Sequence, residues 1–232
     1  MRLLCIDTET TGLEPDTADV IEIACALYDT GTRSLLCAHS WLLPGPAVTP
    51  ESVAANGITE AMLDAAVPVG SPLGEALTLA DLADVVVAHN APFDRKFLAK
   101  LSPRWDERAW IDSERDLTFR HERGSKRLIH LAADNGVWMP GHHRALADVM
   151  MLLALLGRLD DLEAQIRRAL KPRVTVMAVV PFERKDEAKA RGFGWNATAR
   201  RWEKAIPEDE LEALAAEMPF PVRVVAGARS AA

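Results

Sequence analysis

The stretch DVVVAHN, residues 84–90, constrains the fold more than any other part of this chain. Three consecutive valines favour an extended backbone, and a continuous apolar run is typical of an interior, parallel strand. The segment APFDRKFLAKL follows at once, with Pro92 near its start, where a helix tolerates the missing N–H. A parallel strand that leads directly into a helix predicts an α/β fold.

The segments before and after this stretch predict the rest of the sheet. RLLCIDTET, DVIEIACALYD and SLLCAHSWLLP are three strands joined by short turns, which indicates an antiparallel meander. RAWIDSERDL predicts a fifth short strand running into a helix, and PGPAVTPESVAANG predicts a loop. Further helices are expected at TEAMLDAA, PLGEALTLADL, KRLIHLAADNG and ALADVMMLLALLGRL. Together these elements predict a mixed five-stranded sheet with flanking helices.

The chain length allows one substantial core and a small additional module. Of 232 residues 49% are hydrophobic, and Lys171-Pro172 marks the expected boundary between domains 1–170 and 171–232, the second a small α+β module. No stretch approaches the roughly 20 apolar residues that span a bilayer, and the start lacks the apolar region of a signal peptide. Three cysteines without CxxC spacing are expected as reduced core thiols, which favours a cytoplasmic location: Cys5, Cys25 and Cys37.

The net charge of −7 is distributed unevenly along the chain. Residues 1–170 hold 16 Lys and Arg against 25 Asp and Glu, a net of −9, whereas residues 171–232 hold 11 against 9, a net of +2. A basic field is what normally attracts a polyanion. If the acidic part binds one, cations other than side chains must help, and divalent metal is the obvious candidate.

Four acids are the candidates for such a site. Asp7 and Glu9 lie two apart on the first strand, so they leave the same face with Cα atoms roughly 6.5–7 Å apart, although such a pair alone is typical of a solvated strand end. Asp94 lies in the first turn of the helix after the valine run, where an acid also stabilises the helix dipole. Asp148 falls within an apolar helix, where an unpaired carboxylate is costly, unless Arg144 pairs with it four residues away.

Convergence of the four acids would require bound cations. Two carboxylates about 5 Å apart repel by roughly 3 kcal/mol at an effective dielectric near 20. Oxygen ligands of this kind suit hard divalent metals. Two such ions about 3.5–4 Å apart can clamp a phosphodiester.

The blocks DTETTGL, HNAPFD and HHRALAD, in this order, resemble the three sequence blocks of the DEDDh 3′–5′ exonucleases. That superfamily has a ribonuclease-H-like fold and includes the proofreading subunit of bacterial replicative polymerase. VIEIA and TPESVAANGITEAML extend the resemblance over residues 1–160, toward the bacterial exonuclease X branch. Relatives often carry histidine before GIT, where this chain has Asn56, which leaves open what that loop contacts.

The resemblance implies a role for each acid and for one histidine. Asp7, Glu9, Asp94 and Asp148 would hold two Mg²⁺ or Mn²⁺ ions, and His143 would be the general base. His143, not His142, has the H-x4-D spacing. Residues five apart on one helix point about 140° apart, so His143 must lie in the loop or cap before the helix. Histidine accepts a proton near neutral pH, and the implied reaction is in-line hydrolysis that releases a nucleoside 5′-monophosphate.

The expected substrate contacts follow the first and fourth strands: Thr10, Gly12, Leu13, Asn90 and Phe93. Gly12 permits close backbone approach to the terminal sugar or phosphate. By the resemblance Leu13 wedges against the terminal bases, with a loop-anchoring role as the alternative. Phe93 either stacks on a nucleotide or packs beneath the site, and Asn90 also suits a turn.

The segment PFERKDEAKARGFGWNATARRWEKAIP interleaves basic residues with Phe182, Phe193, Trp195 and Trp202. This composition fits binding of single-stranded nucleic acid by stacking and phosphate contacts. The alternative is that so small a module needs its aromatic residues, both tryptophans included, as core. The segment is similar to a small domain of unknown function in which KDEAK is followed by a glycine and then by two separated tryptophans.

The expected partner is therefore the 3′ end of a nucleic acid, with DNA favoured over RNA. No membrane association is expected, and a homodimer is a candidate assembly. Two alternatives stay open. The same site would serve an RNA-trimming exoribonuclease, because the chemistry is indifferent to the sugar. A non-catalytic or proofreading accessory subunit is the other.

Overall fold

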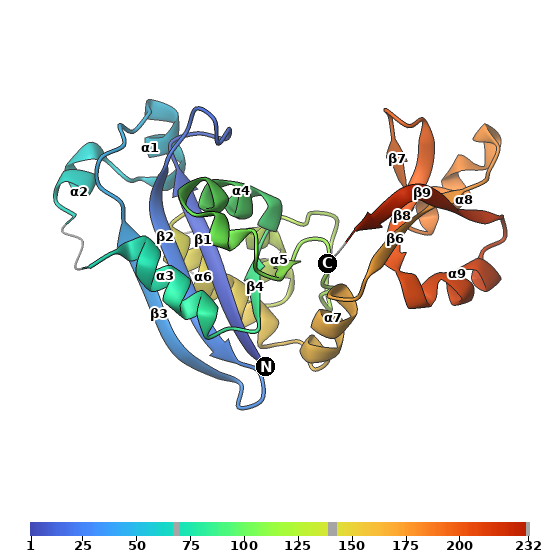
Figure 1. The fold of residues 1–232 in the computed structure, drawn as a ribbon, viewed down its shortest axis with the longest axis horizontal. Coiled ribbons are helices and arrows are strands. Elements are labelled where there is room, and N and C mark those ends of the chain that lie inside the picture. The colour runs from blue at the N-terminus through green and yellow to red at the C-terminus, as the bar shows by residue number, and fades with distance from the viewer. Residues whose placement is uncertain (67–69, 139–142, 231–232) are drawn as a thin grey trace. The chain divides into compact units, whose positions relative to one another are not determined.

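The computed structural model describes residues 1–66, 70–138 and 143–230 (Figure 1). It forms two compact units, Met1–Ile166 and Arg167–Ala232, so the contacts divide the chain four residues before the expected boundary. Each unit has its own sheet and core. Among the described residues no helix is long and apolar enough to cross a membrane.

The first unit is built on a mixed sheet of five strands in the order β3-β2-β1-β4-β5. Its strands are β1 (Arg2–Thr10), β2 (Val20–Asp29), β3 (Ser34–Leu42), β4 (Val85–Ala88) and β5 (Trp110–Asp112). The first three form the predicted antiparallel meander, and the valine strand β4 pairs in parallel with both β1 and β5. The prediction of a mixed five-stranded sheet is confirmed.

The described residues up to Ala169 form seven α-helices, the last of which continues past Ile166 into the second unit. They are α1 (Pro50–Asn56), α2 (Glu60–Asp64), α3 (Pro72–Asp81), α4 (Ala91–Leu101), α5 (Leu128–Asp134), α6 (Ala145–Leu156) and α7 (Leu162–Ala169), with a 3₁₀ turn η1 (Pro103–Trp105). α7 was absent from the sequence expectations. The expected helix after the fifth strand is wrong, because residues 113–127 are all described and hold no helix. There the Asp112 carboxylate accepts the Glu114 N–H at 3.0 Å and folds the chain into a turn.

The expected loop over residues 44–57 is also partly wrong, because α1 forms within it. Thr49 caps this helix, and its side chain and that of Ser52 exchange hydrogen bonds with each other's backbone N–H groups. Pro50 at the first position needs no hydrogen-bond donor there. Gly57 then ends the helix in the left-handed conformation.

The sheet is covered on both faces, and this decides where each side chain of β1 points. Figure 1 shows α3 and α4 in front of the sheet and α6 behind it. Leu4 and Ile6 pack in the core that α3 and α4 share, while α6 packs against β1 and β2. Because side chains alternate along a strand, Thr8 continues the α4 face, whereas Asp7 and Glu9 continue the α6 face.

The second unit is a four-stranded antiparallel sheet in the order β7-β8-β6-β9, which confirms the α+β module. Its elements are β6 (Arg173–Ala178), η2 (Phe182–Arg184), α8 (Lys185–Ala190), β7 (Gly194–Asn196), β8 (Arg201–Pro207), η3 (Glu208–Glu210), α9 (Leu211–Glu217) and β9 (Val222–Ser230). Its core contains Val174, Val176, Ala178, Ala188, Phe193, Ile206 and Phe220.

The three cysteines are free thiols in the first sheet. Cys5 and Cys25 are fully buried, and burial raises the pKa of each to about 12, so neither is ionised at neutral pH. Cys37 is partly buried.

Candidate active site

Three acids meet where β1 leaves the sheet. One carboxylate oxygen from each of Asp7, Glu9 and Asp148 lies within 4.8 Å of the others. The first two come from the α6 face of β1, and Asp148 lies in the first turn of α6, which packs on that face. A hollow lined by carboxylate oxygens at such spacing could hold a divalent metal ion.

Asp94 approaches the same strand end from the opposite face. It lies in the first turn of α4 and is 2% exposed. Its Oδ1 accepts two hydrogen bonds from Thr8, one from the backbone N–H at 2.9 Å and one from the hydroxyl at 2.8 Å. Thr8 lies between Asp7 and Glu9 in sequence, so this threonine ties Asp94 to the strand that carries the other acids.

The carboxylates are crowded enough to resist ionisation. Burial raises the pKa of Asp7 well above its usual range, and the charges of Asp94, Glu9 and Asp148 add to the effect. Burial likewise raises the pKa of Glu9 to about 7, and that of Asp94 to about 7 against the opposing hydrogen bonds from Thr8. Divalent cations would relieve this repulsion, and an all-oxygen donor set is the one that Mg²⁺ and Mn²⁺ prefer.

His143 lies two residues before the start of α6, outside the regular helix, as its spacing from Asp148 requires. It is exposed, and its backbone has a positive φ of 64°. Its backbone N–H donates to Asp148 Oδ2 at 3.2 Å, so the loop and the acid are joined directly. His142 lies outside the described residues.

The Arg144 guanidinium pairs with Glu22 and not with Asp148, the acid four residues along the chain. Its Nε and Nη2 each donate to a Glu22 carboxylate oxygen at 3.0 Å, and the Ala145 N–H donates at 3.1 Å. Glu22 is 1% exposed, and the Ser40 hydroxyl also donates to it, at 2.7 Å. Burial alone would raise the pKa of Glu22, but the hydrogen bonds from Arg144 and Ser40 outweigh burial and lower it.

Asn56 is a second residue that the sequence did not place at the site. It is 5% exposed, and its side chain hydrogen-bonds Glu9, which lowers the pKa of that acid against the effect of burial. Its Oδ1 accepts the Ile58 N–H at 3.0 Å, so the amide is fixed from both sides. The available signal was the position of Asn56 before GIT, where relatives often carry histidine.

The turn after β1 presents one exposed apolar side chain. Leu13 is 79% exposed, which does not fit a loop-anchoring role. Thr10 donates from its hydroxyl to the Gly12 carbonyl at 2.6 Å and so tightens the turn. A Cβ at Gly12 would lie 3.2 Å from the Ala18 Cβ, so a side chain there would crowd the Ala18 side chain.

At the start of α4, Asn90 and Phe93 have structural partners. Asn90 adopts the left-handed conformation with φ of 66°, and its backbone N–H donates to Asp112 Oδ1 at 3.0 Å. The Phe93 ring is partly buried, with its centroid 4.9 Å from that of Phe97. The packing role of Phe93 and the turn role of Asn90 are therefore both realised.

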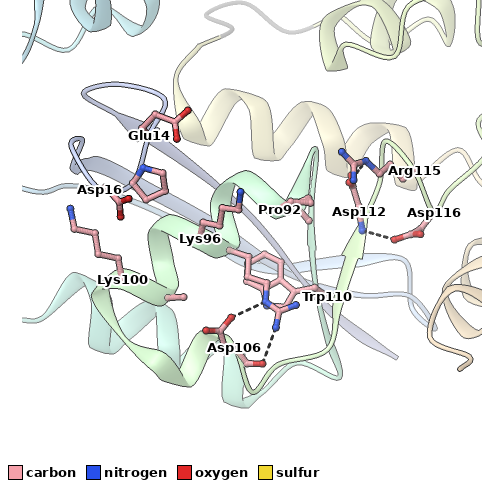
Figure 2. A pocket seen from close by; sticks show the side chains of 14 residues that line it. Glu14, Asp16, Pro92, Lys96, Lys100, Asp106, Trp110, Asp112, Arg115 and Asp116 are labelled. Carbon is pink, nitrogen blue, oxygen red and sulfur yellow. Dashed lines mark hydrogen bonds and ion pairs between the residues drawn. The ribbon is translucent and has the colours of Figure 1, made fainter. Parts of the chain in front are cut away.

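Beyond α4 lies a hollow of about 960 Å³, shown in Figure 2. Lys96 and Lys100 of α4 line it together with Glu14 and Asp16 of the turn after β1. Its charges are largely paired, since Arg95 Nε lies 3.0 Å from Asp106 and Arg115 Nε lies 3.4 Å from Asp112. The four clustered acids are not among the described residues that line this hollow. The hollow is therefore separate from the group of acids that could bind metal.

Residues 4–156 match the RNase T family of exonucleases. This chain belongs to the DEDD 3′–5′ exonuclease family. The matched range contains the clustered acids of both sheet faces and ends at the last residue of α6.

Similarity extends to DEDD exonucleases and to polymerases that contain such a domain. The chain is 28% identical to DNA polymerase III PolC-type from Thermotoga maritima over 194 residues, which are 76% of this chain and 14% of the polymerase. It is 28% identical to the oligoribonuclease of Aromatoleum aromaticum over 175 residues, which are 69% of this chain and 93% of that enzyme. The match thus spans a small part of the polymerase and nearly all of the oligoribonuclease.

Solved structures give the same fold. Exonuclease X in complex with 5′-overhanging duplex DNA matches with a TM-score of 0.50 and 28% identity, over 67% of this chain and 89% of that one. E. coli exonuclease I in complex with a dT13 oligonucleotide matches with a TM-score of 0.59 over 76% of this chain and 48% of that one. At 18% identity the second likeness shows the fold alone.

Proposed function

We propose that this DEDD exonuclease removes nucleotides from the 3′ end of DNA and releases nucleoside 5′-monophosphates, using two divalent cations and His143 as general base. The observation that carries the proposal is the group of three carboxylate oxygens from Asp7, Glu9 and Asp148 within 4.8 Å. The fourth acid, Asp94, has its charge close enough to raise the pKa of Asp7.

Each polar group then has one task. The four acids hold two Mg²⁺ or Mn²⁺ ions, which supply positive charge that stabilises the transition state and promotes ionisation of a water. His143, joined to Asp148 through its backbone N–H, accepts the proton of the attacking water. The bond that breaks joins phosphorus to the 3′-oxygen of the penultimate nucleotide, which leaves in line with the attack.

The turn after β1 positions the strand end in this proposal. Leu13, 79% exposed at the tip of the turn, stacks against the terminal base. The backbone N–H groups of Gly12 and Leu13 meet the terminal sugar and phosphate, because Gly12 adds no side chain there. Phe93 and Asn90 contact the nucleotide with the surfaces that their packing partners leave open.

One comparison favours DNA as the substrate, and another favours RNA. Exonuclease X, 28% identical, is solved with duplex DNA. The oligoribonuclease is equally similar and matches over 93% of its length. An exoribonuclease that uses the same site is therefore the second candidate function.

The test compares DNA and RNA strands of identical sequence, each labelled at its 5′ end, in separate Mg²⁺-dependent digestions. We expect kcat/KM for DNA to exceed that for RNA by at least about tenfold. A preference for RNA of that size would replace the DNA proposal with the exoribonuclease. An Asp148→Asn variant, inactive on both strands, controls for contaminating nucleases.

A further inference from the structure

The aromatic residues of the second unit divide into buried and exposed groups. Phe193 and Phe220, 2% and 5% exposed, meet edge to face in its core with ring centroids 5.8 Å apart. Trp202 is partly buried against the same core. Trp195 is 52% exposed, so the core does not account for it.

Trp195 and Lys204 lie on the same face of this sheet. Trp195 pairs with Trp202, which packs on the core, and Lys204 pairs with the core residue Val176. Because directly opposite residues share a face, both side chains leave the sheet on its core side, near its β7 edge.

Trp195 is also held at a fixed angle. It lies opposite Trp202 in the β7–β8 ladder, and the two rings tilt by 56° with centroids 5.6 Å apart. One side of the Trp195 ring is therefore supported, while about half of the residue meets solvent. Such an aromatic surface suits stacking by a flat ligand.

Cations predominate in the segment that contains Trp195. Residues 191–204 contain four cations, Arg191, Arg200, Arg201 and Lys204, and one acid, Glu203. Arg201 Nε lies 2.7 Å from Glu203, so these two charges cancel. The Lys204 ammonium donates to the Arg191 carbonyl oxygen at 3.1 Å, and in the described part of the chain no carboxylate neutralises it.

We propose that the exposed side of the Trp195 ring, together with Lys204 on the same face, binds single-stranded nucleic acid. One unpaired base stacks on Trp195, an adjacent phosphate pairs with Lys204, and Arg200 and Arg191 extend the basic edge along the backbone. An exposed ring beside a cation with no acidic partner among the described residues is the combination that recognises unstacked bases and phosphates. This inference rests on the proposed function in one respect: the strand that it holds is the substrate of the exonuclease site.

The occupant is a strand and not a duplex, because a paired base has no free face to offer Trp195. A protein partner fits less well. Its hydrophobic anchor would lie among cations, whereas a phosphate backbone is complementary to them.

The test measures binding without catalysis. The anisotropy of a 5′-fluorescein-labelled oligothymidylate of about 20 nucleotides, a length that covers one binding unit of a single-strand-binding fold, is titrated with the full chain in EDTA. We expect Trp195→Ala to weaken binding by about tenfold and Trp195→Phe to restore most of the affinity. We expect Lys204→Gln to reduce the slope of log affinity against log salt by about 0.7, the value for one phosphate on a single strand.

Phe182→Ala is the matched control, because Phe182 is 74% exposed in the same unit, lies outside the β7–β8 hairpin and carries Lys185 over its ring at 4.1 Å. We expect this variant to bind within twofold of the wild type. Wild-type affinity of Trp195→Ala, an equal loss in Phe182→Ala, or equal affinity for a blunt duplex would overturn the proposal. Because EDTA prevents hydrolysis, Trp195-dependent binding by a chain that degrades no nucleic acid would refute the proposed function alone.

Discussion

The carboxylate of Glu22 and the guanidinium of Arg144 form a two-pronged ion pair at 3.0 Å, although 122 positions separate them in sequence. Arg144 lies between His143 and the first residue of α6, and Glu22 lies opposite Glu9 in the β1–β2 ladder. The pair therefore fixes the start of the helix that carries Asp148 against the strand next to Glu9. This connection leads to the first prediction.

Arg144→Ala is expected to lower the free energy of unfolding by about 2–3 kcal/mol. The change leaves Glu22, 1% exposed, as a buried charge with only Ser40 and a backbone N–H as donors, and removal of one partner from a fully buried pair costs about 3–5 kcal/mol. The estimate is lower here because the Arg144 side chain is 38% exposed. Urea denaturation measures it. Arg95→Ala, which breaks the exposed pair with Asp106, is the control, with an expected loss below about 1 kcal/mol.

Thr8→Val is expected to weaken binding of divalent cations. Valine has the shape of threonine but lacks the hydroxyl that donates to Asp94 Oδ1 at 2.8 Å, so ionisation of that acid becomes less favourable. The loss of one hydrogen bond to a buried charged group is worth about 1.5–3 kcal/mol. Calorimetric titration with Mn²⁺ at pH 8 measures the change. The control is Thr78→Val, on the exposed surface of α3, which should leave the affinity for Mn²⁺ unaltered. An unaltered affinity in Thr8→Val would show that Thr8 does not support cation binding.

Stability without metal is expected to fall as the pH rises. In the folded chain the pKa values of Asp7, Glu9 and Asp94 are all raised, the last two to about 7, whereas acids in the unfolded chain have pKa values near 4. The folded state holds the extra protons, so their contribution to stability is full below about pH 4 and is lost as the pH passes 7. Bound divalent cations would take the place of those protons at the carboxylates and restore the lost stability.

The measurement is thermal unfolding with saturating Mg²⁺ or with EDTA. We expect Mg²⁺ to raise Tm more at pH 8 than at pH 5, because protons compete with the cation at the lower pH. In Asp7→Asn the difference between the two pH values should shrink. Equal increments at both pH values in the wild-type protein would show that these acids do not take up the cation.

His143→Ala is expected to reduce kcat by roughly 10²–10⁴-fold, the usual range for loss of a general base, while cation binding stays nearly intact. Asp7→Asn should lose both turnover and cation binding, because Asp7 is a proposed ligand of the cations. Single-turnover digestion and Mn²⁺ titration separate the two effects. His130→Ala serves as the control, since that exposed ring bonds Ser125 in the loop before α5. Wild-type turnover in His143→Ala would remove the base assignment.

The sheet was predictable because its strands are local patterns. The valine run, the meander and the helix that starts at Ala91 each follow from consecutive residues, so the position of Asp94 in a first helical turn also followed. The helix expected after β5 does not form, also for a local reason: the Asp112 carboxylate accepts the Glu114 backbone N–H, two residues on, and turns the chain. Sequence periodicity does not register such a side-chain bond.

The supporting residues of the site were not predictable because their partners are distant in sequence. Glu22 reads as one polar position in an apolar strand, and only the register of β1 and β2 brings it beside Glu9. Asn56 reads as a loop residue until α1 forms and buries it against Glu9. Composition also could not distinguish Trp195 from Trp202, because both leave the same face of the β7–β8 hairpin and only the position of β7 at the sheet edge leaves Trp195 exposed.

The most direct test of the account is a digestion of 5′-labelled single strands with a free or a chemically blocked 3′ end. The account predicts that Mg²⁺ or Mn²⁺ supports stepwise shortening and release of nucleoside 5′-monophosphates from the free end, none from the blocked end, and none with EDTA or in Asp148→Asn. Wild-type protein that leaves both DNA and RNA intact with either ion, or that shortens the blocked strand equally, would contradict it.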